Sequence, residues 1–142
     1  KSCDNFAWYG RGPQENYSDR RTAAFMGRYS GKVADMRWHY IRPQETGNHT
    51  DVREATLTDD AGYGIEVRGL QPLEVSALDP GLVKHQQHDS DVSPALHDVY
   101  LYVDLAQRGL GGDNSWGALP YKHYRLDGKE YSYSFVLSPV KP

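Results

Sequence analysis

The sequence is poor in cysteine, with only Cys3 among its 142 residues. A single cysteine rules out an internal disulfide and a zinc site built from cysteines. No apolar run approaches the roughly 18 residues that a membrane-spanning helix needs. The net charge of −3 lacks the basic excess that is usual in nucleic-acid-binding proteins. We therefore expect neither a membrane nor a nucleic acid as a partner. These features do not distinguish a cytoplasmic from a periplasmic location.

Tyrosine, glycine and proline are what the sequence has in quantity. It holds 11 Tyr against 3 Trp and 3 Phe, together with 14 Gly and 8 Pro. Tyrosine favours strands, whereas glycine and proline mark turns and interrupt helices. Apolar residues make up 38% and charged residues 25%, as is typical of one globular domain. The composition therefore predicts an all-β protein.

Alternation of apolar and polar residues predicts the strands. Residues 98–105 place one apolar set on one face: Val99, Leu101, Val103 and Leu105. Residues 130–138 do the same with Tyr131, Tyr133, Phe135 and Leu137. Weaker alternation predicts further strands at 53–58, 64–68 and 72–77. Such short strands between turns indicate a sandwich or a barrel.

Turn and helix signals complete the expected organisation. Asp and Gly residues predict turns at 59–62 and at Gly69, and a tight hairpin at 127–128. Only residues 21–28 and a start at Pro13 suggest helical turns. Residues 1–5 and 139–142 carry no strand pattern, so we expect both ends of the chain to be cut.

Two segments are rich in polar residues that could meet a ligand. Residues 8–20 include Glu15 and Arg20, which form either a structural corner or a pocket wall. Residues 40–53 include Glu45, His49 and Arg53, which could bind a polyhydroxylated ligand or supply a general acid–base pair. A loop stabilised by its own polar side chains is the simpler interpretation of the second segment.

The third dense segment is a glycine run at residues 109–117. A phosphate-binding loop would need a helix to follow it, but residues 116–120 read WGALP. The run instead predicts an irregular loop that presents Trp116, with Asp113, Asn114 and Ser115 in support. An indole at such a place either joins a core or an interface, or stacks on the C–H face of a sugar.

Other chemistry finds little support in the sequence. His85 and His88 lack a third ligand at a diagnostic spacing, so they predict a solvated loop and not a metal site. Nothing singles out two of the 19 acidic residues as a glycosidase pair. Apart from Glu45 and His49, the residue patterns therefore indicate no catalytic pair, and they indicate no cofactor in this chain.

Three segments, taken together in the order in which they occur, resemble those of a known family. They are WYGRGPQENYSDR at 8–20, RPQETGNHTDVR at 42–53 and GLGGDNSWG at 109–117. Together they resemble the C-terminal domain, or small chain, of the β-galactosidases of glycoside hydrolase family 2. The resemblance implies an antiparallel β-supersandwich of the galactose mutarotase-like type. Because the family domain is about twice as long, residues 1–142 correspond to its second half, a partial domain.

The resemblance also implies a function. The parent enzyme hydrolyses terminal β-D-galactosides such as lactose with retention, and its catalytic glutamates lie in a separate barrel domain. Trp116 matches the tryptophan that this domain lends to the substrate pocket, whereas Glu15, Arg20, Glu45, His49 and Arg53 belong to structural motifs. Divalent and monovalent cations, where the parent requires them, are expected in other domains. The resemblance leaves open whether the parent enzyme is a homo-oligomer.

Two alternative functions remain at this stage. One is a free-standing carbohydrate-binding module that uses exposed aromatic side chains. The other is an aldose epimerase, suggested by fold-level analogy alone, which would use His49 and Glu45. The isolated fragment of a galactosidase, in contrast, is expected to be inactive.

Overall fold

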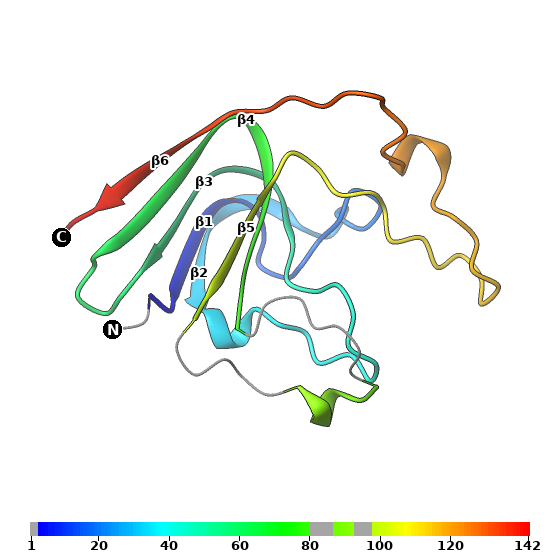
Figure 1. The fold of residues 1–142 in the computed structure, drawn as a ribbon, viewed down its shortest axis with the longest axis horizontal. Coiled ribbons are helices and arrows are strands. Elements are labelled where there is room, and N and C mark those ends of the chain that lie inside the picture. The colour runs from blue at the N-terminus through cyan, green and yellow to red at the C-terminus, as the bar shows by residue number, and fades with distance from the viewer. Residues whose placement is uncertain (1–2, 80–86, 93–97) are drawn as a thin grey trace.

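A computed structural model describes residues 3–79, 87–92 and 98–142 of the chain. It shows one antiparallel sheet in the order β2-β1-β3-β4-β5, with β6 also paired to β4 (Figure 1). The strands are β1 (Asn5–Gly12), β2 (Phe25–Lys32), β3 (His49–Thr58), β4 (Gly64–Leu78), β5 (Tyr100–Asp104) and β6 (Phe135–Val140). Short 3₁₀ turns are η1 (Val33–Asp35), η2 (Asp89–Asp91) and η3 (Lys122–Tyr124). Within these ranges, none of the helical turns has the length or apolarity to cross a membrane.

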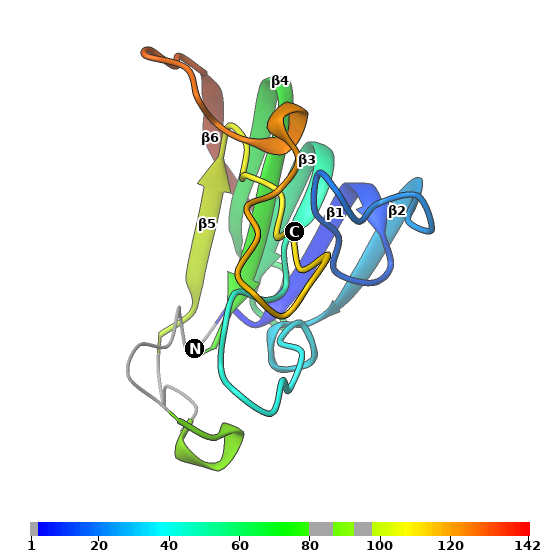
Figure 2. The ribbon, with the colours of Figure 1, turned by 90° about the vertical axis from the view of Figure 1, so that its right-hand side faces the viewer.

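The long strand β4 organises the sheet. Its first half, residues 64–69, pairs with β6, and its last residues, 74–78, pair with β5. Because β3 occupies the other edge along both halves, β5 and β6 share one edge of β4. The sheet curls around this strand, as the two perpendicular views show (Figures 1 and 2). The predicted all-β, antiparallel class is confirmed.

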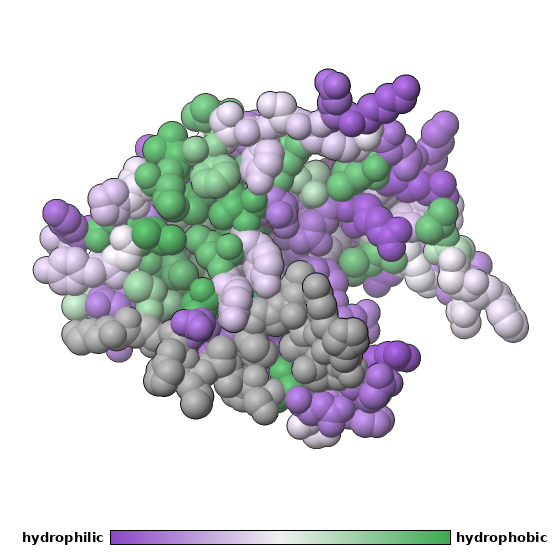
Figure 3. All heavy atoms as spheres, viewed as in Figure 1, coloured by the Kyte–Doolittle hydropathy of each residue, from purple (hydrophilic) through white to green (hydrophobic). Residues whose placement is uncertain are grey.

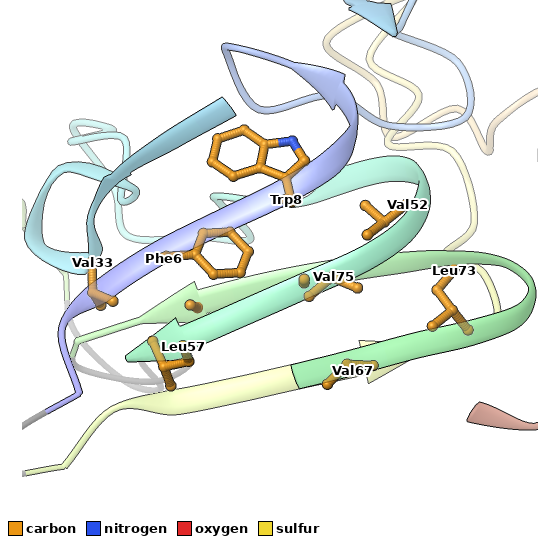
Figure 4. Close-up of a cluster of buried hydrophobic side chains, with 10 residues drawn as sticks. Phe6, Trp8, Val33, Val52, Leu57, Val67, Leu73 and Val75 are labelled. Atoms are coloured by element: carbon orange, nitrogen blue, oxygen red, sulfur yellow. The ribbon is translucent and has the colours of Figure 1, made fainter. Parts of the chain in front are cut away.

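The core lies on one face of the curled sheet. Alternate residues of three strands point into it: Phe6 and Trp8 from β1, Val52, Ala55 and Leu57 from β3, and Val67, Leu73, Val75 and Ala77 from β4 (Figure 4). The rings of Phe6 and Trp8 stack with centroids 5.1 Å apart. Burying each large apolar side chain contributes about 1.5–3 kcal/mol, so this face holds the fold together.

Several predicted elements are present. The strand expected at 98–105 is β5, and the one expected at 53–58 is the second half of β3. The turn at 59–62 joins β3 to β4, where the Gly62 amide donates to the Asp59 carbonyl at 3.0 Å. The two strands expected at 64–68 and 72–77 are one strand, β4, because the chain runs through Gly69 without reversing.

Other local predictions are wrong. Residues 21–28 form no helix, because β2 begins at Phe25 and pairs with β1. The hairpin at 127–128 is also absent, since Tyr124 lies in η3 and the last strand pairs with β4 instead. That strand begins only at Phe135, which pairs with Gly69, and it runs to Val140, into the expected tail. Pairing between distant segments overrode the local signals.

Candidate functional site

The candidate site is the loop between β5 and η3, which extends away from the sheet (yellow to orange in Figure 1). Trp116 lies on this loop with 92% of its surface exposed. Gly111 and Gly112 precede it with φ angles of +72° and +87°, a left-handed conformation that glycine adopts without strain. The predicted irregular loop with an exposed indole is therefore present.

The three supporting residues shape the tip of this loop. Asn114 Oδ1 accepts hydrogen bonds from the amides of Trp116 at 2.9 Å and Ala118 at 3.4 Å. The Asp113 carboxylate accepts a hydrogen bond from the Tyr121 hydroxyl, which raises the pKa of Tyr121. Ser115 is exposed. Asn114 thus closes a short local turn that fixes the backbone beside the indole.

Hydrogen bonds to backbone carbonyls hold the base of the loop. The Gly109 amide donates to the Tyr124 carbonyl at 2.7 Å, and Arg125 Nε donates to the Pro120 carbonyl at 2.6 Å. A hollow of about 340 Å³ lies beside the base. Its walls are Asp19, Arg20, Gly111, Asp113, Pro120, Tyr121, His123 and Tyr124.

The Glu15 carboxylate connects its own loop to residues 40–47 by hydrogen bonds. Its Oε1 accepts from the Tyr40 hydroxyl, and its Oε2 accepts from Thr46 Oγ1 at 3.0 Å and from the Gly47 amide at 2.6 Å. Burial, and then the bond to Glu15, raise the pKa of Tyr40 to about 12. Both carboxylate oxygens of Glu15 are therefore used within the protein.

His49 is a core residue. It is 2% exposed, and its ring stacks on the Trp8 indole with centroids 3.9 Å apart. Burial lowers the pKa of His49 to about 4, against a smaller opposite effect of a hydrogen bond to the Arg11 backbone. An imidazole covered in this way has no access to a sugar, so the geometry does not support an epimerase that uses it as a base.

A buried polar cluster lies where β4 and β5 meet. Asn48 Nδ2 donates to Glu74 Oε2 at 2.8 Å, and Gln107 Nε2 lies 3.4 Å from both Asn48 Oδ1 and Asp104 Oδ2. Burial raises the pKa of the neighbouring Glu45. No pattern in the sequence indicates this cluster, because its members come from three separate segments that meet only in the folded chain.

The structure brings together only some of the predicted residues. Arg20 contacts the Trp116 loop through Gly111, whereas Glu15, Glu45 and His49 use their polar groups inside the protein and Arg53 is exposed on β3. His85 lies outside the described residues. Among the residues that the structure does describe, no group of three His, Cys, Asp or Glu side chains is placed to hold a metal ion.

Comparison with known proteins finds relatives among enzymes that act on galactosides. A family model described as "Beta galactosidase small chain" matches residues 1–137. A β-galactosidase of Priestia megaterium is 41% identical over 139 residues, which are 96% of this chain. β-Galactosidase BgaC of Bifidobacterium adolescentis is 39% identical over 86% of the chain, and a β-galactosidase of Streptococcus thermophilus is 33% identical over 96%.

These relatives are much longer than the chain described here. The matched region makes up 13% of the Priestia protein, 12% of the Bifidobacterium protein and 14% of the Streptococcus protein. The similarity therefore concerns one part of each relative.

Proposed function

The chain belongs to the β-galactosidase small chain family, and on that premise we propose that it is the second half of the C-terminal β-sandwich domain of a retaining β-galactosidase. In this proposal the parent enzyme hydrolyses terminal β-D-galactosides such as lactose. The chain lends the substrate pocket one sugar-stacking side chain, Trp116. The catalytic carboxylates, and the sites of any divalent or monovalent cation, belong to other domains of the same polypeptide.

The exposed indole of Trp116 is the observation that carries this proposal. A tryptophan usually buries most of its surface in a folded protein, yet this one is 92% exposed on a loop whose base is held by hydrogen bonds. The apolar C–H face of a pyranose can lie flat on such a ring, while the sugar hydroxyls bind polar groups around it. An indole held at a defined place helps to orient the glycosidic bond for attack.

The placement of the carboxylates supports a division of labour between domains. A retaining glycosidase needs two carboxyl groups about 5–5.5 Å apart on either side of the scissile bond. Glu74, an acid whose pKa is raised by burial, is 7% exposed and bonded to Asn48. A sugar cannot enter that cluster, so Glu74 is not one of the pair. As the family resemblance implies, the proposal assigns the reacting acids to a separate barrel domain.

An exposed apolar face supports the assignment to half of a larger domain. Leu137 pairs with Val67 of the core, and Phe135 pairs with Gly69, so both side chains lie on the core side of the sheet. Both remain exposed. Apolar atoms gather on the surface in the part of the molecule where Figure 1 shows β4 and β6 (Figure 3). Patches of this kind mark surfaces that another part of a protein covers. We assign that cover to the first half of the domain.

Substitution of Trp116 in the full-length parent protein tests the assignment. Loss of stacking in Trp116→Ala should raise KM for lactose roughly tenfold, since such contacts contribute on the order of 1 kcal/mol or more. Trp38→Ala is the matched control, because Trp38 is also exposed, at 64%, but lies on another loop. Unchanged kinetics in Trp116→Ala would remove the site assignment.

The carbohydrate-binding module is the second candidate, since an exposed indole would serve it equally well. Calorimetric titration of the isolated chain with lactose separates the two. Sub-millimolar affinity favours the module, and weak or undetectable binding favours the domain of an enzyme. The isolated chain should also leave nitrophenyl galactoside intact, and hydrolysis by the chain alone would contradict the proposal.

A further inference from the structure

Asp19 and Arg20, which are consecutive in the sequence, hold the base of the Trp116 loop by hydrogen bonds. The Gly111 amide donates to Asp19 Oδ2 at 2.8 Å, and Arg20 Nη2 donates to the Gly111 carbonyl. Both backbone groups of one residue are thus held by neighbouring side chains from a segment far away in the sequence. Hydrogen bonds that involve a charged group are about twice as strong as neutral ones, so this is a firm attachment.

The glycine run is what lets the two segments approach so closely. A Cβ atom on Gly109 would lie 2.7 Å from Asp19 Oδ2, and one on Gly112 would lie 3.1 Å from Arg20 Nη2. The same Cβ on Gly109 would also lie 2.9 Å from Tyr124 Cβ, so close contact with Asp19 and Tyr124 explains this glycine. Gly112 is explained mainly by its φ of +87°, because the end of the Arg20 side chain can shift by the small distance that a Cβ would require.

The segment that carries Asp19 and Arg20 is bonded to the buried part of the protein. Arg20 and Tyr17 form a backbone bridge, in which the Arg20 amide donates to the Tyr17 carbonyl at 2.8 Å. The Tyr17 side chain is buried, and the preceding Asn16 amide donates to the Asn48 carbonyl at 2.7 Å. A continuous chain of contacts thus runs from the interior through residues 16–20 to Gly111.

We propose that Asp19 and Arg20 are positioning residues for Trp116: they hold the loop that carries the indole, so that the indole meets the sugar in one place. The inference rests on the proposed role of Trp116. Neither side chain needs to contact the sugar, because both act through the Gly111 backbone. Small displacements of a group that orients substrate can weaken catalysis strongly.

Kinetics of the full-length parent protein test the inference. Arg20→Ala and Asp19→Ala should each raise KM for lactose about fivefold to tenfold. Because both residues act through the indole, the rise should not exceed the roughly tenfold effect expected for Trp116→Ala. Asp19→Asn keeps an acceptor oxygen and should restore much of the loss. Because Arg20 acts through the indole, the double variant Arg20→Ala/Trp116→Ala should match Trp116→Ala alone. Additive effects on KM would overturn the inference.

Asp59→Ala is the matched control. Asp59 Oδ1 also accepts backbone amides, from Ala61 at 2.8 Å and Tyr63 at 3.0 Å, but it lies in the turn between β3 and β4. That turn and the Trp116 loop lie at opposite ends of the molecule (Figure 1). Asp59→Ala should leave KM unchanged, and a rise equal to that of Asp19→Ala would show that loss of stability, and not positioning, is the cause.

A second measurement does not depend on catalysis. In the 142-residue chain, nitrogen-15 relaxation of the Trp116 indole should report greater mobility in Arg20→Ala than in the unmodified chain, with Trp116→Phe identifying the signal. Equal mobility would contradict the inference. If Trp116→Ala leaves KM unchanged in the parent while Arg20→Ala still mobilises the indole, the proposed function fails and the positioning contact stands.

Discussion

Glu74 accepts a hydrogen bond of 2.8 Å from the side-chain amide of Asn48, with both residues almost fully buried. Burial raises the pKa of Glu74 from 4.5 to about 7. The bond from Asn48 opposes that rise, as does the positive charge of Arg21, whereas the charge of Asp104 adds to it. A carboxyl in these surroundings is most stable in its protonated form, so the folded chain should hold this proton at a higher pH than the unfolded chain.

Glu74→Gln should therefore change how stability depends on pH. Between pH 4.5 and 7 the folded chain binds the Glu74 proton and the unfolded chain does not, so Glu74 makes stability fall as pH rises. The full effect is on the order of 3 kcal/mol. Glutamine keeps an acceptor for Asn48, so Glu74→Gln should be more stable than the unmodified chain at pH 8 and similar to it at pH 4. Urea unfolding at both pH values measures this, and an equal difference at both would disprove it.

His49 should act in the opposite direction. Its folded pKa of about 4 lies below the unfolded value of 6.5, so its contribution is complete above pH 6.5 and is lost as the pH falls toward 4. His49→Phe or His49→Leu should remove this loss and leave stability falling with rising pH through Glu74 alone. Because the effects of Glu74 and His49 oppose each other, the stability of the unmodified chain should change less with pH than that of Glu74→Gln or of a His49 variant. Urea unfolding across pH 4–7 measures the slopes, and a His49 variant with the unmodified slope would contradict the assignment.

Two leucines of β4 should differ sharply in their effect on stability. Leu73 is 1% exposed in the core, whereas Leu70 is 71% exposed. Leu73→Ala should cost about 2–5 kcal/mol, the usual loss for a buried leucine. Leu70→Ala should stay within about 0.5 kcal/mol, as is normal for surface positions. Chemical unfolding of the two variants provides the test, and similar midpoints would mean that the core is misplaced.

Removal of the Glu15 carboxylate should loosen residues 40–47. Glu15→Ala leaves Thr46 and the Gly47 amide without their acceptor, which costs about 1–3 kcal/mol when such groups stay buried. The pKa of Tyr40, raised to about 12 in part by Glu15, should fall. A tyrosine absorbance titration, compared with Tyr40→Phe in each background, measures that change. An unaltered Tyr40 titration would rule out the contact.

Local patterns predict some strands well and others not at all. Residues 98–105 and 53–58 alternate cleanly because one face meets the core and the other meets solvent. β1 and β2 are not predicted, since Gly10, Gly12 and Gly27 interrupt their alternation. A Cβ on Gly10 would meet Val52 at 2.8 Å, so that glycine serves a close approach which only the neighbouring strand explains.

The sequence predicts the kind of candidate site but not its connections. The glycine run and Trp116 indicate an irregular loop with an exposed indole, and the loop has that form. The sequence does not indicate the partners of the charged residues within 8–20. Arg11 pairs with Asp51 of β3 at 2.5 Å, while Asp19 and Arg20 bind Gly111. These partners lie far away in the sequence, where local patterns carry no information about them.

The amino-acid order alone determined the all-β class, the family resemblance and the exposed aromatic loop, because alternation, turn residues and short motifs are local properties. Tertiary structure decided which acid is buried, which histidine joins the core and which side chains hold the loop. Burial and long-range hydrogen bonds depend on segments that meet only after the sheet has curled. For that reason the same residue types, Glu15 and Glu74 or His49 and His123, have different surroundings and different chemistry in one chain.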